Sequence, residues 1–146
     1  MSFGRAASGV PREGFARVAA GADCPCGSGE WFDGCCGAVL AGRPARTAER
    51  LMRSRYTAFV VGDARYLAAS WHPGTRPDDV TLDPALRWTG LEIVQTQAGG
   101  PEDARGTVEF RATWRHGAEQ GELHERSRFV RQSGSWWYVD GQVTAI

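Results

Sequence analysis

The sequence contains no lysine and no asparagine, so its strong cations are all arginines. The 17 basic residues balance 17 aspartates and glutamates, and the formal net charge at pH 7 is zero. Because neither positive nor negative charge is in excess, the composition gives no strong nucleic-acid signal and predicts no electrostatic attraction to an anionic membrane. Because every strong cation is a guanidinium, a site that needs positive charge suits a carboxylate or phosphate partner.

Long apolar runs are also missing, and no stretch reaches the roughly 18 apolar residues that a membrane-spanning helix needs. Residues 1–22 are small, polar and rich in glycine, and they lack the continuous apolar segment of a secretory signal. We therefore expect no membrane association and a cytoplasmic location. Thiols stay reduced in that compartment, so clustered cysteines there favour a metal over disulfides.

The length of 146 residues suits one compact body with a small appended module. We expect a flexible leader over residues 1–22, a cysteine-rich zinc module over 23–42 and a body over 43–146. A module of about 20 residues cannot bury a core of its own, whereas a body of roughly 100 residues can.

The module holds every cysteine of the chain within the stretch CPCGSGEWFDGCCG, at Cys24, Cys26, Cys35 and Cys36. Two close pairs joined by a turn can place four sulfurs about 2.3 Å from one zinc ion in a tetrahedron. Gly27 and Gly29 let the backbone bend tightly around an ion, and Ser28 can donate a hydrogen bond to a thiolate. We expect a structural Zn²⁺, since four protein ligands leave no position for a water.

Two alternatives to the zinc site remain. Disulfides are one, although a bridge between the adjacent Cys35 and Cys36 would be strained and crossed pairs need an oxidising compartment. A redox dithiol at Cys24 and Cys26 is the other, because closely spaced thiols can exchange disulfides.

Residues 47–62 of the body predict a helix, with Thr47 as its N-cap and Gly62 as its C-terminal stop. Its apolar side chains recur at steps of three and four residues: Ala48, Leu51, Met52, Tyr56, Phe59 and Val60. Asp63 is expected to cap a second short helix, which Pro73 must end. These two helices precede the strands in the chain.

From Trp88 onward the hydrophobic period changes to two, after one further helical turn expected at Asp83 and Pro84. In the stretch TVEFRATWRHG, one face collects Val108, Phe110, Ala112 and Trp114. Such alternation is typical of half-buried antiparallel strands. We therefore expect an α+β body with helices packed on one face of a curved, four-stranded antiparallel sheet.

The stretch CPCGSGEWFDGCCG resembles the SEC-C motif, the zinc-binding tail of the SecA translocation ATPase. The four cysteines and the Ser28–Gly29 pair match that motif, and Glu30 stands where the motif commonly has a basic residue. The resemblance implies zinc bound by all four cysteines. Because the SecA tail also docks on a chaperone and on the ribosome, it implies a possible protein partner for the module.

The wider chain resembles the YchJ-like family of bacterial proteins over about residues 22–142. The blocks that carry this resemblance include TAERLMRSRYTAFVVGDARYLAASWHP, GTVEFRA, HERSRFVR and WWYVDG. It implies a SEC-C module joined to a nuclear transport factor 2-like domain, a cone-shaped α+β fold. It implies no particular reaction.

Folds of this type hold a pocket between the helices and the concave sheet, which serves enzymes and binding proteins alike. The side chains expected to line it are Arg53, Arg55, Tyr56, Trp71, Glu125, Ser127 and Tyr138. Strand alternation aims Glu125 and Ser127 toward the apolar face. We expect a buried ion pair there between Glu125 and an arginine such as Arg53 or Arg55.

We expect a binding or adaptor protein with a structural zinc site and a possible small-molecule ligand in the cone. One alternative is a SnoaL-like enzyme of the same fold, with acid–base chemistry at His72, Glu125 or Asp140. A third hypothesis is a thiol redox protein that uses Cys24 and Cys26.

Overall fold

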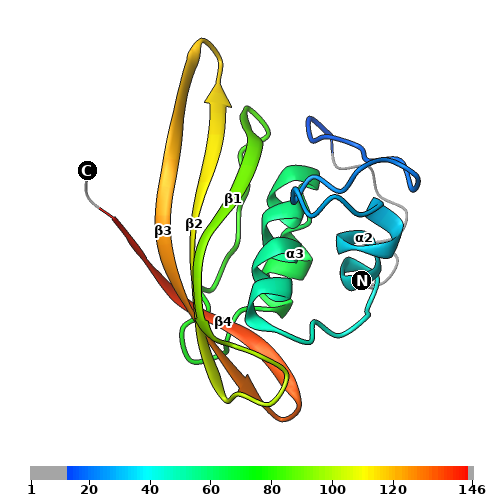
Figure 1. The fold of residues 1–146 in the computed structure, drawn as a ribbon. Helices are drawn as coiled ribbons and strands as arrows, with labels where there is room; N and C mark the ends of the chain where they lie inside the picture. The colour runs from blue at the N-terminus through cyan, green and yellow to red at the C-terminus, as the bar shows by residue number, and fades with distance from the viewer. Residues whose placement is uncertain (1–12, 145–146) are drawn as a thin grey trace.

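The computed structural model of the chain describes residues 13–144. The helical elements are η1 (Phe32–Gly34), α2 (Cys36–Leu40), α3 (Ala48–Val61) and α4 (Ala64–Ala69). The strands are β1 (Leu86–Ala98), β2 (Arg105–His116), β3 (Glu119–Gln132) and β4 (Ser135–Val143). These strands form one antiparallel sheet in the order β1-β2-β3-β4, as predicted (Figure 1). None of the helices in residues 13–144 is both long and apolar enough to cross a membrane.

The predicted caps position the two main helices. The Thr47 side chain accepts a hydrogen bond from the Arg50 N–H at 3.0 Å, and Gly62 ends α3 in the left-handed conformation with φ of 75°. The Asp63 side chain accepts from the Tyr66 N–H at 3.0 Å and so starts α4. These contacts confirm both helix starts and the first helix end.

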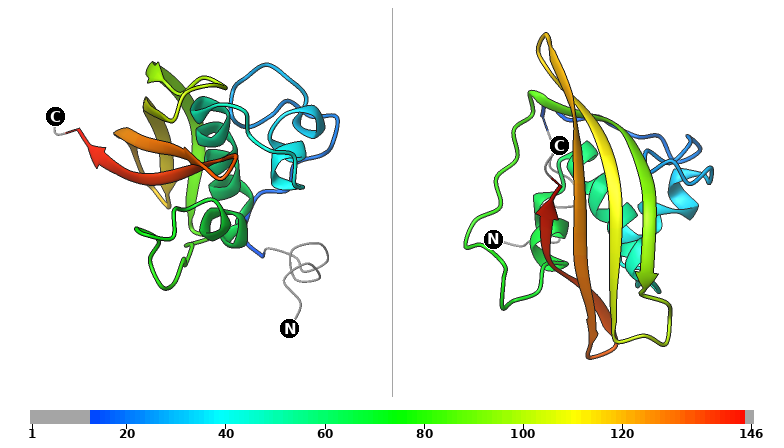
Figure 2. Two further views of the ribbon diagram at one scale, coloured as in Figure 1. Left: turned by 90° about the horizontal axis from the view of Figure 1, so that it is seen from below. Right: turned by 60° about the vertical axis from the view of Figure 1, so that its left-hand side comes forward.

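The sheet has one inward face, which follows the predicted alternation. Val108, Phe110 and Ala112 are buried on β2, and their partners on β3 are Ser127, Glu125 and Leu123. Glu125 and Ser127 therefore share the inward face, as predicted. Register shifts along β1 bend the sheet into a trough that faces α3 (Figure 2).

The helical turn predicted at Asp83 and Pro84 is wrong. The Asp83 side chain accepts from the Ala85 N–H at 2.9 Å, which makes a tight turn, and β1 begins at Leu86. Leu86 pairs with His116 on β2. Pairing with a distant strand therefore overrides the local helix-start signal.

Helix α3 lies between two layers (Figure 1). One side packs on the sheet, and the other side faces the segment with η1 and α2. Ser54, Arg55 and Thr57 are therefore buried along with the apolar stripe, Thr57 toward the cysteine segment and Arg55 toward the sheet and α4. The sequence pattern revealed only one buried side, since polar side chains line much of the other.

Residues 13–22, which belong to the predicted leader, contact the rest of the chain. Phe15 packs on the end of α3, where a Cβ added to Gly62 would lie 2.5 Å from its ring. The Phe32 N–H donates to the Ala22 carbonyl at 2.8 Å. Residues 1–12 of the predicted leader lie outside the described residues.

Candidate metal centre and cone cavity

The four cysteines form one buried cluster. Their sulfur atoms all lie within 4.8 Å of one another, and no cysteine is more than 5% exposed. Gly27 and Gly29 have φ of 78° and 84°, a conformation that favours glycine, and they turn the chain back between the two cysteine pairs. The segment η1 and the start of α2 carry Cys35 and Cys36 to the same point.

The sulfur geometry fits a tetrahedral metal site. The sulfurs of Cys26 and Cys35 are 3.7 Å apart, and four sulfurs 2.3 Å from one ion would be about 3.8 Å apart. A disulfide would require a separation of about 2.0 Å, and all four cysteines are free. The arrangement is compatible with metal binding, and no disulfide joins these residues in the structure.

The guanidinium of Arg50 reaches the cluster from α3. It donates to the sulfurs of Cys35 and Cys36 at 2.9 Å each, and Ser28 lies 3.1 Å from the Cys35 sulfur. Burial lowers the pKa of Arg50, but the charge of Cys36 and the hydrogen bond to Cys35 outweigh burial, so the pKa is raised overall. A permanent cation therefore offsets thiolate charge at this site.

A second arginine on α3 ties the cysteine segment to the body. Arg53 donates to the Cys26 carbonyl at 2.7 Å and pairs with Glu49 at 2.9 Å. Thr57 lies 4.0 Å from the Cys24 sulfur. Arg53 was predicted to line the cone pocket, and this placement is wrong because its side chain points to the cysteines instead.

Sequence analysis missed Arg50 and Thr57 as parts of the cysteine site. The signal was present, because Arg50, Arg53 and Thr57 are spaced by three and four residues and share one side of the helix. That polar stripe lies beside the apolar one. It is explained only when the cysteine segment is known to pack on it.

Replacing Arg50 with glutamine is expected to speed release of a metal bound at the cluster to a chromogenic chelator by about tenfold or more. The variant would leave the thiolates of Cys35 and Cys36 without their charged donor. Arg43→Gln is the matched control, since Arg43 is exposed and has no hydrogen bond to a cysteine within residues 13–144. Equal release rates for the Arg50 variant and the wild type would contradict this role.

A cavity of about 130 Å³, called the cone cavity below, lies between α3 and the inward face of the sheet. Six of the seven predicted pocket residues line it: Arg55, Tyr56, Trp71, Glu125, Ser127 and Tyr138. The seventh, Arg53, does not. Trp71 reaches the cavity from the loop after α4, where its backbone bridges to Tyr138 on β4.

Arg55 is a buried cation in the cavity wall, only 4% exposed. It donates through Nη1 to the Leu67 carbonyl at 2.8 Å and to the Ser70 hydroxyl at 2.7 Å. Its guanidinium also lies over two rings, 4.3 Å from the centroid of Tyr138 and 4.9 Å from that of Trp71. Burial lowers the pKa of Arg55 to about 10, so the side chain stays charged at neutral pH.

The predicted buried ion pair of Glu125 is wrong. Its Oε2 accepts from the Ser127 hydroxyl at 2.7 Å, and no ion pair joins it to an arginine within residues 13–144. Arg53 is engaged by the cysteine segment, and Arg55 directs Nη1 at the end of α4. Gly141 on β4 leaves room for the Glu125 carboxylate, which a Cβ at that position would overlap.

The three acid–base candidates do not share one cavity. His72 makes hydrogen bonds to Gln132 at 2.8 Å and to the Gly74 N–H at 3.0 Å, and it does not line the cavity. Asp140 pairs with Arg128 at 2.7 Å, and this hydrogen bond lowers the pKa of its carboxyl. Only Glu125 faces the cavity, so the geometry does not assemble the acid–base set of the enzyme hypothesis.

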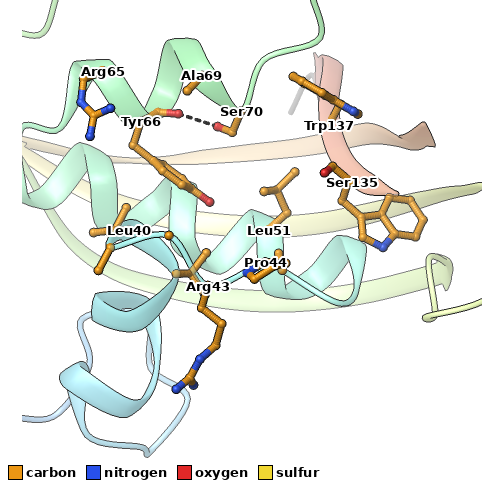
Figure 3. Close-up of a pocket in the computed structure, with 15 residues that line it drawn as sticks. Leu40, Arg43, Pro44, Leu51, Arg65, Tyr66, Ala69, Ser70, Ser135 and Trp137 are labelled. Carbon is orange, nitrogen blue, oxygen red and sulfur yellow. Dashed lines mark hydrogen bonds between the residues drawn. The ribbon is translucent and has the colours of Figure 1, made fainter. Parts of the chain in front are cut away.

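A second hollow of about 370 Å³ lies where the end of α2 meets α4 and the start of β4 (Figure 3). Its inner polar groups are already paired: the Tyr66 hydroxyl lies 2.6 Å from that of Ser54, and Ser70 donates to the Tyr66 carbonyl at 2.8 Å. Arg43 and Arg65, which also line it, are exposed. This hollow is a surface groove and offers fewer free buried polar groups than the cone cavity.

Residues 47–141 match the family described as YchJ, middle NTF2-like domain. A UPF0225 protein of Streptomyces coelicolor is 55% identical over 120 residues, which cover 82% of this chain and 94% of that protein. A UPF0225 protein of Chromobacterium violaceum is 47% identical over 127 residues, which cover 84% of this chain and 93% of that protein.

Two solved structures of SEC-C motif containing proteins share the fold. The solution structure of the protein from Rhodopseudomonas palustris gives a TM-score of 0.73 at 34% identity, covering 85% of this chain and 100% of that one. The crystal structure of the protein from Psychrobacter arcticus gives a TM-score of 0.62 at 26% identity, covering 84% of this chain and 83% of that one.

Proposed function

The chain belongs to the YchJ-like family, the UPF0225 proteins, and from this premise we propose that it is a zinc-stabilised, small-ligand-binding protein. In this proposal a structural Zn²⁺ joins the SEC-C segment to the nuclear transport factor 2-like body. The body holds a small molecule in the cone cavity. No catalytic step is part of the proposal.

The donor set supports zinc as the metal. Four clustered cysteine sulfurs suit a soft tetrahedral ion, and four protein ligands leave no open position for catalysis. Arg50 and Arg53 reach the cysteine segment from α3, so an ion that holds this segment together would also preserve its hydrogen bonds with the helix. When bound, zinc would supply structural cross-linking of Cys24, Cys26, Cys35 and Cys36.

The observation that carries ligand binding is the cone cavity itself. A volume of about 130 Å³ remains between α3 and the sheet, beside buried residues of the main hydrophobic core such as Met52, Tyr56 and Phe110. Arg55, Glu125 and the indole of Trp71 converge on this mainly apolar space. Convergent polar groups in an apolar cavity are typical of small-molecule sites, whereas the fold alone specifies no ligand.

The SEC-C segment presents one large apolar side chain to solvent, Trp31, which is 68% exposed. Single exposed apolar side chains are common on protein surfaces. The partner expected for the module therefore remains outside this proposal.

Protein purified without added metal is expected to contain about one zinc per chain by elemental analysis.

Dissolved xenon, which enters apolar cavities irrespective of ligand chemistry, is expected to shift the NMR signals of Met52 and Leu123 in the cavity wall. Ala112→Leu should abolish these shifts by filling the cavity, whereas Ala69→Leu in the surface groove should not. Absence of any transition metal would overturn the first half of the proposal, and xenon shifts unaffected by Ala112→Leu would overturn the second.

A further inference from the structure

Resting on the proposed ligand role of the cone cavity, we infer that its ligand is small, flat and uncharged. The ligand would present a hydrogen-bond acceptor to Arg55 and a hydrogen-bond donor to Glu125. Primary amides and heteroaromatic rings that carry both a carbonyl and an N–H belong to this class.

The walls set the size and shape of the ligand. Aromatic rings from α3, the sheet and the loop after α4 surround the space, among them Tyr56, Trp71, Trp88 and Phe110. Flat rings on several sides favour a flat ligand that can stack on them. The volume of about 130 Å³ is below that of pockets for drug-sized molecules, so the ligand is expected to be the size of a single ring.

Trp71 lines the cavity with its ring, and its indole N–H is unpaired. The indole nitrogen is buried and has no hydrogen-bond partner in the described part of the chain. The backbone around it is fixed, since the His72 N–H donates to the Tyr138 carbonyl at 2.8 Å and the Tyr138 N–H donates to the Ser70 carbonyl at 2.9 Å. Because this nitrogen has almost no accessible surface, an acceptor atom has no room beside it, and Trp71 offers a ligand only its ring.

Arg55 forms the donor end of the cavity. Both of its hydrogen bonds within the described residues use Nη1, which caps the end of α4. Neither Nε nor Nη2 has a partner there. The structural role of Arg55 in holding α4 thus accounts for one nitrogen of the guanidinium and leaves the N–H groups of the other two nitrogens for a ligand.

Glu125 forms the acceptor end. Its Oε2 is engaged by the Ser127 hydroxyl, while Oε1 has no hydrogen-bond partner in the described residues. A ligand N–H or O–H is the complement of this oxygen. The cavity therefore offers donors from Arg55 and an acceptor from Glu125.

The charges of the lining determine the charge of the ligand. Arg55 and Glu125 are the charged side chains among the lining residues, and their charges cancel. An anion would be attracted by Arg55 but repelled by Glu125. A cation would be attracted by Glu125 but repelled by Arg55. Either one would also lose its hydration in an apolar space. A neutral molecule with one donor and one acceptor avoids both costs.

Three probes that share one ring test the inference: benzamide is neutral, benzoate is anionic and benzylamine is cationic. With the ¹⁵N-labelled full chain, benzamide is expected to shift the side-chain N–H signals of Arg55 and to bind at least about tenfold more tightly than either ion. Arg55→Lys keeps the charge and removes the planar group with Nε and Nη2, so it should weaken benzamide binding about three- to tenfold. Arg128→Lys is the matched control, because Arg128 pairs with Asp140 in an exposed position and does not line the cavity.

A second variant reverses the selectivity. Glu125→Gln removes the negative charge and leaves Arg55, so the order of affinity is expected to change in favour of benzoate. Tighter binding of benzoate or benzylamine by the wild type, or benzamide binding that Arg55→Lys leaves unchanged, would overturn the inference. Failure of all three probes in a cavity that still takes up xenon would overturn the ligand class and leave the cavity itself standing.

Discussion

Replacing Cys36 with serine is expected to abolish metal binding and to lower the free energy of unfolding by at least about 4 kcal/mol. This is a fraction of the roughly 10–16 kcal/mol that structural zinc contributes to isolated zinc-finger peptides. The effect should reach the whole chain, because the cysteines belong to the same buried cluster as Leu51 and Tyr56. Loss of a ligand would also leave the partly buried Arg50 facing an incomplete set of thiolates.

Urea unfolding with and without a strong chelator would measure this coupling. The chelator should destabilise the wild type by nearly as much as the substitution does, and it should have little further effect on the Cys36 variant. Ser28→Ala is the matched control, since it keeps all four cysteines and removes only the hydrogen bonds of the Ser28 hydroxyl with the Cys35 sulfur and the Glu30 N–H, which should cost about 1 kcal/mol. A Cys36 variant that keeps its metal, or that unfolds like the wild type, would refute the structural role.

The local features of the fold could be predicted because each depends on neighbours in sequence. Thr47, Gly62 and Asp63 act within one helical turn, and the alternation on β2 depends on a period of two residues. The cysteine cluster was also predictable, since its four ligands lie within one short segment. The turn at Asp83 was not, because the start of β1 depends on pairing with a distant part of β2.

The arrangement of the arginines shows where sequence reasoning reached its limit. Arg53 and Arg55 are two residues apart on a helix, which places them roughly 200° apart around its axis. They cannot both line one cavity, and helical geometry alone could have excluded one of them. Which of the two faces the cavity depends on the packing of the cysteine segment, and that packing is a long-range contact.

The unpaired indole of Trp71 illustrates the same limit. The sequence placed Trp71 at the end of a helix and among the pocket candidates. Its missing hydrogen-bond partner follows from the bridge between the loop after α4 and β4. An absence of this kind is a property of the assembled cavity, and no spacing in the sequence encodes it.

Replacing Arg55 with leucine is expected to lower the free energy of unfolding by about 2–4 kcal/mol. Leucine fills part of the space, but it leaves the Leu67 carbonyl and the Ser70 hydroxyl without their charged donor at the end of α4. It also removes the cation from the rings of Trp71 and Tyr138, an interaction worth about 0.5–2 kcal/mol. The Glu125 carboxylate would then be the one charge left in an apolar cavity.

Urea unfolding of Arg55→Leu and Arg55→Lys separates these contributions. Lysine keeps the charge and loses the planar group, so it should recover only part of the stability. Arg128→Leu is the surface control, because Arg128 pairs with Asp140 in an exposed position where an ion pair contributes little. An Arg55→Leu variant as stable as the wild type would show that the buried guanidinium does not hold α4 against the sheet. The cavity wall built on it would then have to be held by the apolar contacts of α3 alone.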